Sequence, residues 1–200
     1  SKIFVKLRKE FYKKANIKVG PTLSYQLSSL NKKFIKKEDI EVLLILNGIF
    51  KLDKKLIDSA SKILSLHKNL FITIKPHPIL PISKIDKKFL IKYRSRIHVS
   101  SERLDNLLKK TKISICSGPT SACLESIAYK CFLLCPVFEI YDKINLDIFK
   151  IPKNNYKLIY DIEDFSNTLI SLINKKKIYL KTKKIILEKT TDAKIKKFIN

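Results

Sequence analysis

The sequence predicts an α/β fold built on a parallel sheet of about six strands. Short apolar segments recur along the 200 residues, and between them lie segments whose apolar residues repeat at helical spacing. Strands that are apolar throughout, separated by helices, are typical of a sheet covered on both faces with right-handed crossovers. The expected fold class is therefore a Rossmann-like, doubly wound parallel sheet.

Each expected strand is a short apolar run that ends at a breaker. The strand at 41–46, EVLLIL, stops at Asn47-Gly48, and the strand at 70–75, LFITIK, stops at Pro76-His77-Pro78, because proline cannot donate to a ladder. Four more strands are expected, at 96–100, 112–116, 132–137 and 156–160. Helices are expected at 54–66, 104–110, 120–130 and 162–173, with a basic helix or coil leading up to Lys92.

Three parts of the chain are expected. Residues 41–174 form the predicted Rossmann-like domain, 1–40 a basic arm and connector, and 175–200 a basic helical tail. The longest apolar runs are far too short to cross a bilayer, and the first twenty residues lack the continuous apolar segment of a signal peptide. We therefore expect a cytoplasmic protein.

The formal charge of +24 attracts phosphates and acidic lipid head groups. However, only Arg8, Arg94, Arg96 and Arg103 are arginines, and the lysines are spread along the whole chain. Nucleic-acid readers concentrate arginines and exposed aromatic residues. The composition therefore favours a solvated basic surface without specific nucleic-acid binding, and it is compatible with weak peripheral contact with the anionic inner face of the cell membrane.

The four cysteines indicate a reduced core and no metal site. Six, seven and three residues separate Cys116, Cys123, Cys131 and Cys135, and these gaps match no familiar zinc-ligand spacing. Their neighbours are apolar, as expected of buried thiols in a reducing compartment. We expect neither a metal ion nor a cofactor.

The segment from Lys112 to Cys131 predicts a phosphate-binding junction. An apolar strand breaks at Ser117-Gly118-Pro119-Thr120-Ser121 and runs directly into a helix. The first amides of a helix have no internal partner and lie at the positive end of its dipole, so they bind anions. Thr120 and Ser121 can reach a bound anion or simply cap the helix, and for one such turn capping is the commoner role. Glu125 lies one turn after Ser121, where a carboxylate can meet ribose hydroxyls.

His77 is the second candidate ligand group. In parallel sheets, ligands bind beyond the carboxyl ends of the strands. Four segments follow strands directly and should share that edge: Asn47-Gly48, Pro76-His77-Pro78, Ser100-Ser101 and the run 117–121. His77 can then donate a hydrogen bond to a phosphate oxygen or a leaving group from a loop next to Thr120 and Ser121.

These residues carry a resemblance to a known family. The order of strand, KPHP, strand, helix, strand, SGPTS, and helix with LES resembles the C-terminal nucleotide-binding half of a GT-B glycosyltransferase, over about 41–173. Lys75-Pro76-His77-Pro78 with Thr120-Ser121 is similar to the HP and paired-hydroxyl motifs of bacterial sialyl-, polysialyl- and Kdo-transferases. The resemblance implies that His77, Thr120 and Ser121 hold the CMP phosphates and that Glu125 meets the ribose. The longer acidic repeat of some GT-B enzymes is absent, because Leu133 stands eight residues after Glu125.

The chain also departs from that family. A GT-B enzyme works in the cleft between two domains, and the CMP-sugar families place the acidic base in the N-terminal one, for which residues 1–40 are too few. The segment 19–25, VGPTLSY, resembles an interdomain connector, so the chain is interpreted as a C-terminal portion of a longer protein or the product of a degraded gene. Asp53 is more easily read as a helix-start residue than as a general base, and no catalytic base is assigned.

The resemblance implies a metal-independent glycosyltransferase that moves a sugar from a nucleotide-activated donor to a surface polysaccharide or lipooligosaccharide acceptor. The families it resembles most indicate a CMP-sugar as the donor. His77 would act catalytically by stabilising the charge of the leaving group. The nucleotide-binding set would be His77, Ser117, Gly118, Thr120, Ser121 and Glu125. The alternatives are a CDP-glycerol-type polyol-phosphate transferase, a GT-B epimerase acting on UDP-sugars, and a non-catalytic nucleotide-binding module.

Overall fold

Six parallel strands form one sheet in the order β3-β2-β1-β4-β5-β6. The computed structural model describes residues 39–118, 120–139 and 153–175. The strands are β1 (Ile40–Ile45), β2 (Ile72–Lys75), β3 (Ile97–Val99), β4 (Thr111–Ile115), β5 (Phe132–Pro136) and β6 (Tyr156–Ile159). The predicted Rossmann-like α/β class is confirmed. The predicted arm up to residue 38 and the tail from residue 176 lie outside the described residues.

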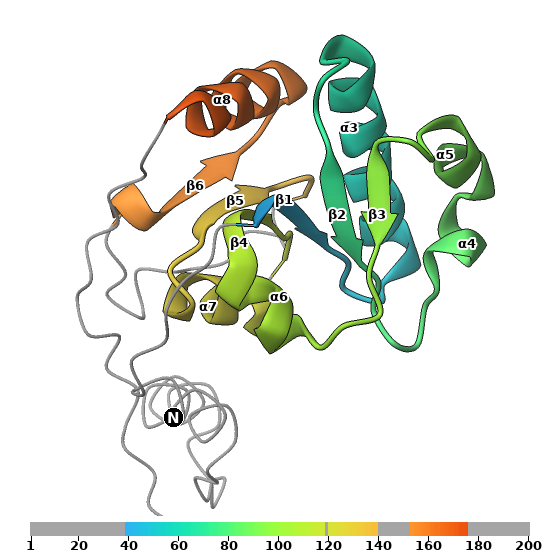
Figure 1. Ribbon diagram of the computed structural model, residues 1–200, viewed down its shortest axis with the longest axis horizontal. Helices are drawn as coiled ribbons and strands as arrows, with labels where there is room; N and C mark the ends of the chain where they lie inside the picture. The colour runs from blue at the N-terminus through green and yellow to red at the C-terminus, as the bar shows by residue number, and fades with distance from the viewer. Residues whose placement is uncertain (1–38, 119, 140–152, 176–200) are drawn as a thin grey trace, which may run out of the picture. The chain divides into compact units, whose positions relative to one another are not determined.

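Helices cover both faces of this sheet (Figure 1). On one face, α3 (Phe50–Leu66) packs against α4 (Ile82–Ile85) and α8 (Ile162–Asn174), with α5 (Lys87–Lys92) beside α4. On the other face, α6 (Leu104–Lys110) packs against α7 (Ser121–Ala128). A short 3-10 helix, Lys153–Asn155, precedes β6. The chain thus crosses from one layer to the other at the β3–α6–β4 connection.

The core lies between the sheet and the layer of α3 and α8. Val42 and Leu44 of β1 and Ile113 and Ile115 of β4 point into it, and all four are almost completely buried. Leu43, on the opposite face of β1, is fully buried as well. The central strands are therefore apolar on both faces, which is why the sequence shows continuous apolar runs there instead of alternation.

Two helix boundaries differ from the expected ones. The helix predicted to begin at 54 begins at Phe50, so Asp53 lies inside its first turn and not at its start. The helix predicted over 120–130 is α7, which ends at Ala128, and Lys130 then adopts a left-handed φ of 59° before β5. Within the described residues, no helix is both long and apolar enough to cross a membrane.

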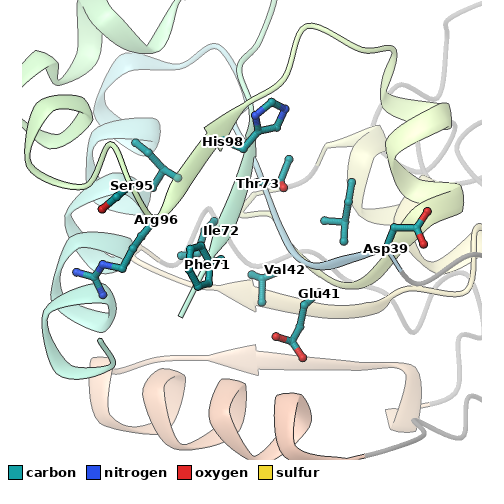
Figure 2. A pocket seen from close by; sticks show the side chains of 11 residues that line it. Asp39, Glu41, Val42, Phe71, Ile72, Thr73, Ser95, Arg96 and His98 are labelled. Carbon is teal, nitrogen blue, oxygen red and sulfur yellow. The ribbon is translucent and has the colours of Figure 1, made fainter. Parts of the chain in front are cut away.

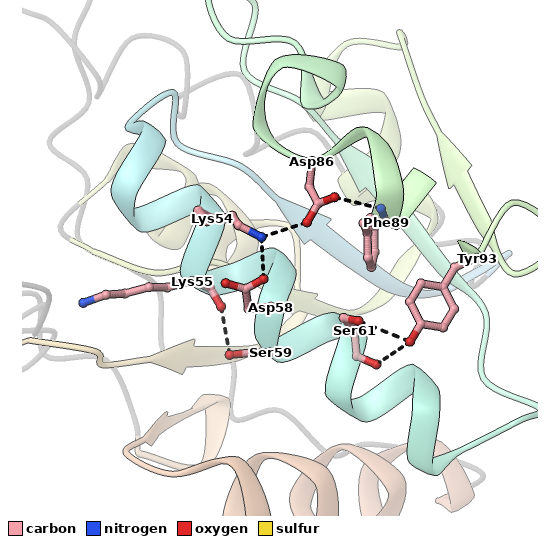
Figure 3. Close-up of polar contacts among 8 residues, drawn as sticks. All are labelled: Lys54, Lys55, Asp58, Ser59, Ser61, Asp86, Phe89 and Tyr93. Carbon is pink, nitrogen blue, oxygen red and sulfur yellow. Dashed lines mark hydrogen bonds and ion pairs between the residues drawn. The ribbon is translucent and has the colours of Figure 1, made fainter. Parts of the chain in front are cut away.

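The ammonium group of Lys54 ties α3 to the start of α5 (Figure 3). It donates to Asp86 at 2.8 Å and to Asp58 at 2.7 Å. The Asp86 carboxylate also accepts the amide of Phe89 at 2.8 Å and so caps α5. The hydrogen bond from Lys54 is the largest cause that holds the pKa of Asp86 below 3.8, and the cap lowers it further.

Replacing Asp86 by Asn should lower the free energy of unfolding by about 0.5–1 kcal/mol at neutral pH, because asparagine keeps the cap but loses the charge facing Lys54. A carboxylate with a depressed pKa stabilises the fold above its unfolded pKa, and this contribution is lost as the pH falls through the folded value. The difference between wild type and D86N should therefore shrink in acid, as measured by urea unfolding.

The matched control is Asp58→Asn, which removes the other carboxylate bound to Lys54. Its side chain is 52% exposed against 19% for Asp86, so water screens it more strongly and D58N should cost less. Equal losses for the two variants would contradict this account.

Candidate functional site

The carboxyl ends of β1, β2 and β4 lie side by side, because all strands are parallel and their last residues are in register. Ile45 pairs with Lys75 of β2, and Leu44 pairs with Ile115 of β4. The loops that follow these strands carry Asn47-Gly48, His77 and the entrance to α7. The structure therefore brings these three predicted segments to one edge of the sheet.

A buried carboxylate organises the turn after β1. Asp53, which is fully buried, accepts the amide of Asn47 at 2.7 Å and the amide of Gly48 at 2.8 Å. Burial raises the pKa of Asp53 above 3.8, whereas these two amides and the nearby His77 ring act in the opposite direction. Asp53 neither starts α3 nor faces solvent, so the structure gives it the task of shaping residues 47–49, hereafter the Asn47 turn.

Gly48 lets the His77 ring come close to the Asn47 turn. Its φ of +81° is strained for any residue with a side chain, and a Cβ built there would lie 2.6 Å from Nδ1 of His77. His77 is half-buried, and its own turn is closed by the amide of Leu80, which donates to the His77 carbonyl at 3.1 Å. The amide of Ile79 donates to Nδ1 at 3.4 Å. The loops after β1 and β2 are thus in direct contact.

Asn47 connects the turn after β1 to the loop after β4. Its Nδ2 donates to the Ser117 carbonyl at 2.9 Å, and its Oδ1 accepts the Cys116 thiol at 3.4 Å. The Cys116 sulfur also lies 3.4 Å from Oγ1 of Thr120, the residue that precedes α7. A continuous series of contacts therefore runs from His77 through the Asn47 turn to the start of α7.

The residues of the predicted phosphate turn have different environments. The Ser117 hydroxyl is buried and donates to the Pro136 carbonyl at 2.6 Å, so this side chain fastens the turn to β5 and only the Ser117 backbone belongs to the edge. Gly118 has a φ of +78°, which glycine adopts without strain. Thr120 occupies the N-cap position, but its hydroxyl makes no capping bond and contacts the Cys116 and Cys123 thiols instead. Ser121, the first residue of α7, is exposed.

Glu125 lies half-buried one turn along α7. Burial raises the pKa of its carboxyl above 4.5, and the charge of Asp105 adds to this, while a hydrogen bond with the Ser121 side chain lowers it. Ser121 and Glu125 are therefore neighbours on one side of α7, as their spacing predicts. The predicted residues Thr120, Ser121 and Glu125 thus line the same helix start.

Two important residues were not recognised as part of the site from the sequence. Asn47 was expected at this edge as a strand breaker but was not included in the nucleotide-binding set, and Asp53 was weighed only as a helix start or a base. The sequence signal for both residues was an Asn-Gly pair directly after a buried strand, with an aspartate a few residues later. An aspartate at that distance can accept the amides of both residues, as Asp53 does.

Four free thiols lie within the described domain, and all are buried. Cys116 and Cys123 pack behind the start of α7, where Cys123 contacts the Gly118 carbonyl at 3.5 Å. Hydrogen bonding with Cys123 and burial raise the pKa of Cys116. Among the described residues, no group of three or more His, Cys, Asp or Glu side chains could hold a metal ion.

A hollow of about 300 Å³ lies at the opposite edge of the sheet, where β1, β2 and β3 begin (Figure 2). Glu41, Phe71, Thr73, Arg96 and His98 are among the residues that line it. It contains none of the predicted site residues and no helix start. Because open parallel sheets bind ligands beyond the carboxyl ends of their strands, we place the candidate site at the edge with His77 and α7.

The comparisons with known proteins rest on structure alone. The sequence matches no protein-family model and no curated protein. The crystal structure of TarM superposes with a TM-score of 0.54 and 16% identity, covering 80% of this chain and 31% of TarM. A variant of TarM from S. aureus, solved with fondaparinux, α-GlcNAc-glycerol and UDP, gives a TM-score of 0.54 and 17% identity over the same shares. The C-terminal domain of LpcC, a glycosyl transferase group 1 family protein from Francisella tularensis, gives 0.49 and 15% identity, covering 80% of this chain and 86% of that domain.

The likeness to TarM establishes the fold. TarM is a GT-B glycosyltransferase, and this chain spans less than a third of its length. The described residues therefore have the Rossmann-like α/β fold of a GT-B domain.

Proposed function

We propose that this chain is the nucleotide-binding half of a GT-B glycosyltransferase, with the donor held at the edge formed by His77 and α7. One observation carries the proposal: the contacts from His77 through the Asn47 turn to Thr120 unite an imidazole and a helix start at the carboxyl ends of β1, β2 and β4. This is the edge at which parallel α/β sheets bind nucleotides.

The helix start supplies the anion-binding groups. The amides of Ser121 and Ala122, the first two of α7, lack helical partners, and the Thr120 hydroxyl leaves them uncapped, whereas the Cys123 amide donates to the Thr120 carbonyl at 3.3 Å. A phosphate there gains hydrogen bonds from these amides and, when the exposed Ser121 hydroxyl turns from Glu125, from its proton, together with the favourable helix dipole. A Cβ on Gly118 would lie 3.3 Å from Cδ2 of Leu52, so glycine lets the turn before α7 pack closely against α3. Glu125, one turn along, is the proposed partner of the ribose hydroxyls.

His77 is the proposed catalytic residue. When the bond between the sugar and the phosphate breaks, negative charge grows on the departing phosphate oxygens. A hydrogen bond from the imidazole and the α7 amides stabilises that charge where it develops, and such interactions accelerate the reaction only as far as they strengthen in the transition state.

For the substrates, we propose a CMP-activated sugar as donor and a surface saccharide as acceptor. The support for CMP is the resemblance of Lys75-Pro76-His77-Pro78 and Thr120-Ser121 to the motifs of CMP-sugar transferases. The TarM structure that contains UDP shows that a protein of this fold is found with a pyrimidine nucleotide. A polyol-phosphate transferase with a CDP-linked donor would use the same groups, so nucleotide preference is the deciding measurement.

We expect CMP to raise the melting temperature of the purified chain more than CDP, UDP or GDP does. A ligand present at 100 times its dissociation constant stabilises the native state by about 2.7 kcal/mol, which a thermal-shift titration detects easily. A larger shift with CDP would favour the polyol-phosphate transferase. The absence of a shift with all four nucleotides would contradict the proposed function.

His77→Ala should weaken binding of the preferred nucleotide about tenfold or more in calorimetric titration, because a hydrogen bond to a charged group contributes about 1.5–3 kcal/mol. His98→Ala is the matched control, since His98 is exposed on β3 and borders the hollow at the opposite edge. Unchanged affinity in H77A would remove His77 from the site.

A further inference from the structure

We propose that the Asn47 turn, held by Asp53, is a positioning device for His77, which fixes the ring so that Nε2–H, and not Nδ1, is the group presented to the phosphate. This inference rests on the proposed function and assigns to Gly48 and Asp53 a role beyond the stability of the fold.

The contact between Gly48 and the ring determines which nitrogen is available. A Cβ on Gly48 would lie 2.6 Å from Nδ1, 2.7 Å from Cγ and 3.2 Å from Cβ of His77, so the Cγ–Nδ1 edge of the imidazole faces the glycine. In a five-membered ring, the atom opposite that bond is Nε2. Nε2 therefore points away from the Asn47 turn. Among the described residues no hydrogen bond to Nε2 is formed, whereas Nδ1 has a partner.

The partner of Nδ1 also determines the tautomer. The amide of Ile79 donates to Nδ1 at 3.4 Å, so Nδ1 must offer a lone pair. In the neutral imidazole the proton then resides on Nε2, which becomes a donor. A donor is the group that a phosphate oxygen requires.

Asp53 is what keeps the glycine in place. Its two hydrogen bonds, to the amides of Asn47 and Gly48, fix the backbone against which the ring packs. Asn47 in turn bonds to the Ser117 carbonyl, so the same turn sets the position of the ring relative to the start of α7. Asp53 is a positioning residue, since its carboxylate is fully buried and cannot contact a ligand.

The tautomer can be measured without any nucleotide. Two-bond ¹H–¹⁵N spectra of the full chain, recorded where the His77 ring is neutral, should show a protonated Nε2 and an unprotonated Nδ1. H77A identifies the resonances of this residue. A protonated Nδ1 in the neutral ring would overturn the inference, whatever the protein binds.

Amide side chains test which nitrogen meets the ligand. The amide nitrogen of glutamine lies near the position of Nε2, and that of asparagine lies near Nδ1. With CMP as the titrant, H77Q should keep an affinity within about threefold of the wild type, and H77N should lose as much as H77A does. Neither substitution removes a hydrogen-bond partner of Asp53, whose oxygens accept the amides of Asn47 and Gly48.

A double-mutant cycle tests the positioning role of Gly48. Gly48→Ala should weaken CMP binding about tenfold, because the new Cβ displaces the ring, yet in an H77A background the same change should leave the affinity unaltered. Equal losses in both backgrounds would show that Gly48 acts only through the fold, and the proposal would then be wrong.

Different results would contradict the positioning role of the Asn47 turn and the proposed function. If the wild type binds CMP but H77Q and H77N behave alike, the positioning inference falls and the proposed function stands. If the wild type binds none of CMP, CDP, UDP and GDP, the proposed function falls, and the role of Nε2 as a phosphate donor falls with it.

Discussion

The carboxylate of Asp53 and its two backbone hydrogen bonds are the constraint on which the edge of the sheet depends. A buried carboxylate is costly unless its oxygens are hydrogen-bonded, and here each oxygen accepts one amide of the turn after β1. The Asn47 turn then directs Asn47 toward β4 and Gly48 toward β2. Without that arrangement, the loops after β1, β2 and β4 would share an edge but have no fixed spacing.

Two buried cysteines, Cys116 and Cys123, support the same edge of the sheet from inside the domain. Cys116 and Cys123 lie between the end of β4 and the first turn of α7, where larger side chains would hold the helix away from the sheet. Thiols are apolar enough to be buried yet can still hydrogen-bond weakly, and the Cys116 sulfur contacts both Asn47 and Thr120. The polar series across the edge therefore passes through a nominally hydrophobic residue.

The sequence was sufficient to predict the features that depend on a local pattern of residues, namely the strands and the loops that follow them. Continuous apolar runs identified β1, β4 and β5, since burial on both faces leaves a signal within a few residues. The less buried strands β2, β3 and β6 were found from short apolar segments between expected helices, and the strand breakers located the loops at the carboxyl edge. Helix starts were less predictable. An aspartate near the beginning of a helix is usually its cap, whereas Asp53 reaches backward from inside the first turn, and a pattern of residue types cannot distinguish these cases. Asn47 was missed as a site residue for a related reason, because its partner, Ser117, lies 70 residues further along the chain.

The strand order also has a consequence for how the chain folds. β1 pairs on one side with β2, the next strand in the chain, and on the other side with β4. The pairing with β4 joins residues far apart in the sequence, such as Ile40 and Thr111. Contacts between residues far apart in the sequence are slow to form, and during synthesis the hydrogen-bonding edge of β1 that faces β4 stays open until the ribosome has released that later segment. The β1–α3–β2 unit can therefore form early, whereas the edge that carries His77 and α7 can be completed only after β4 and α7 have been synthesised.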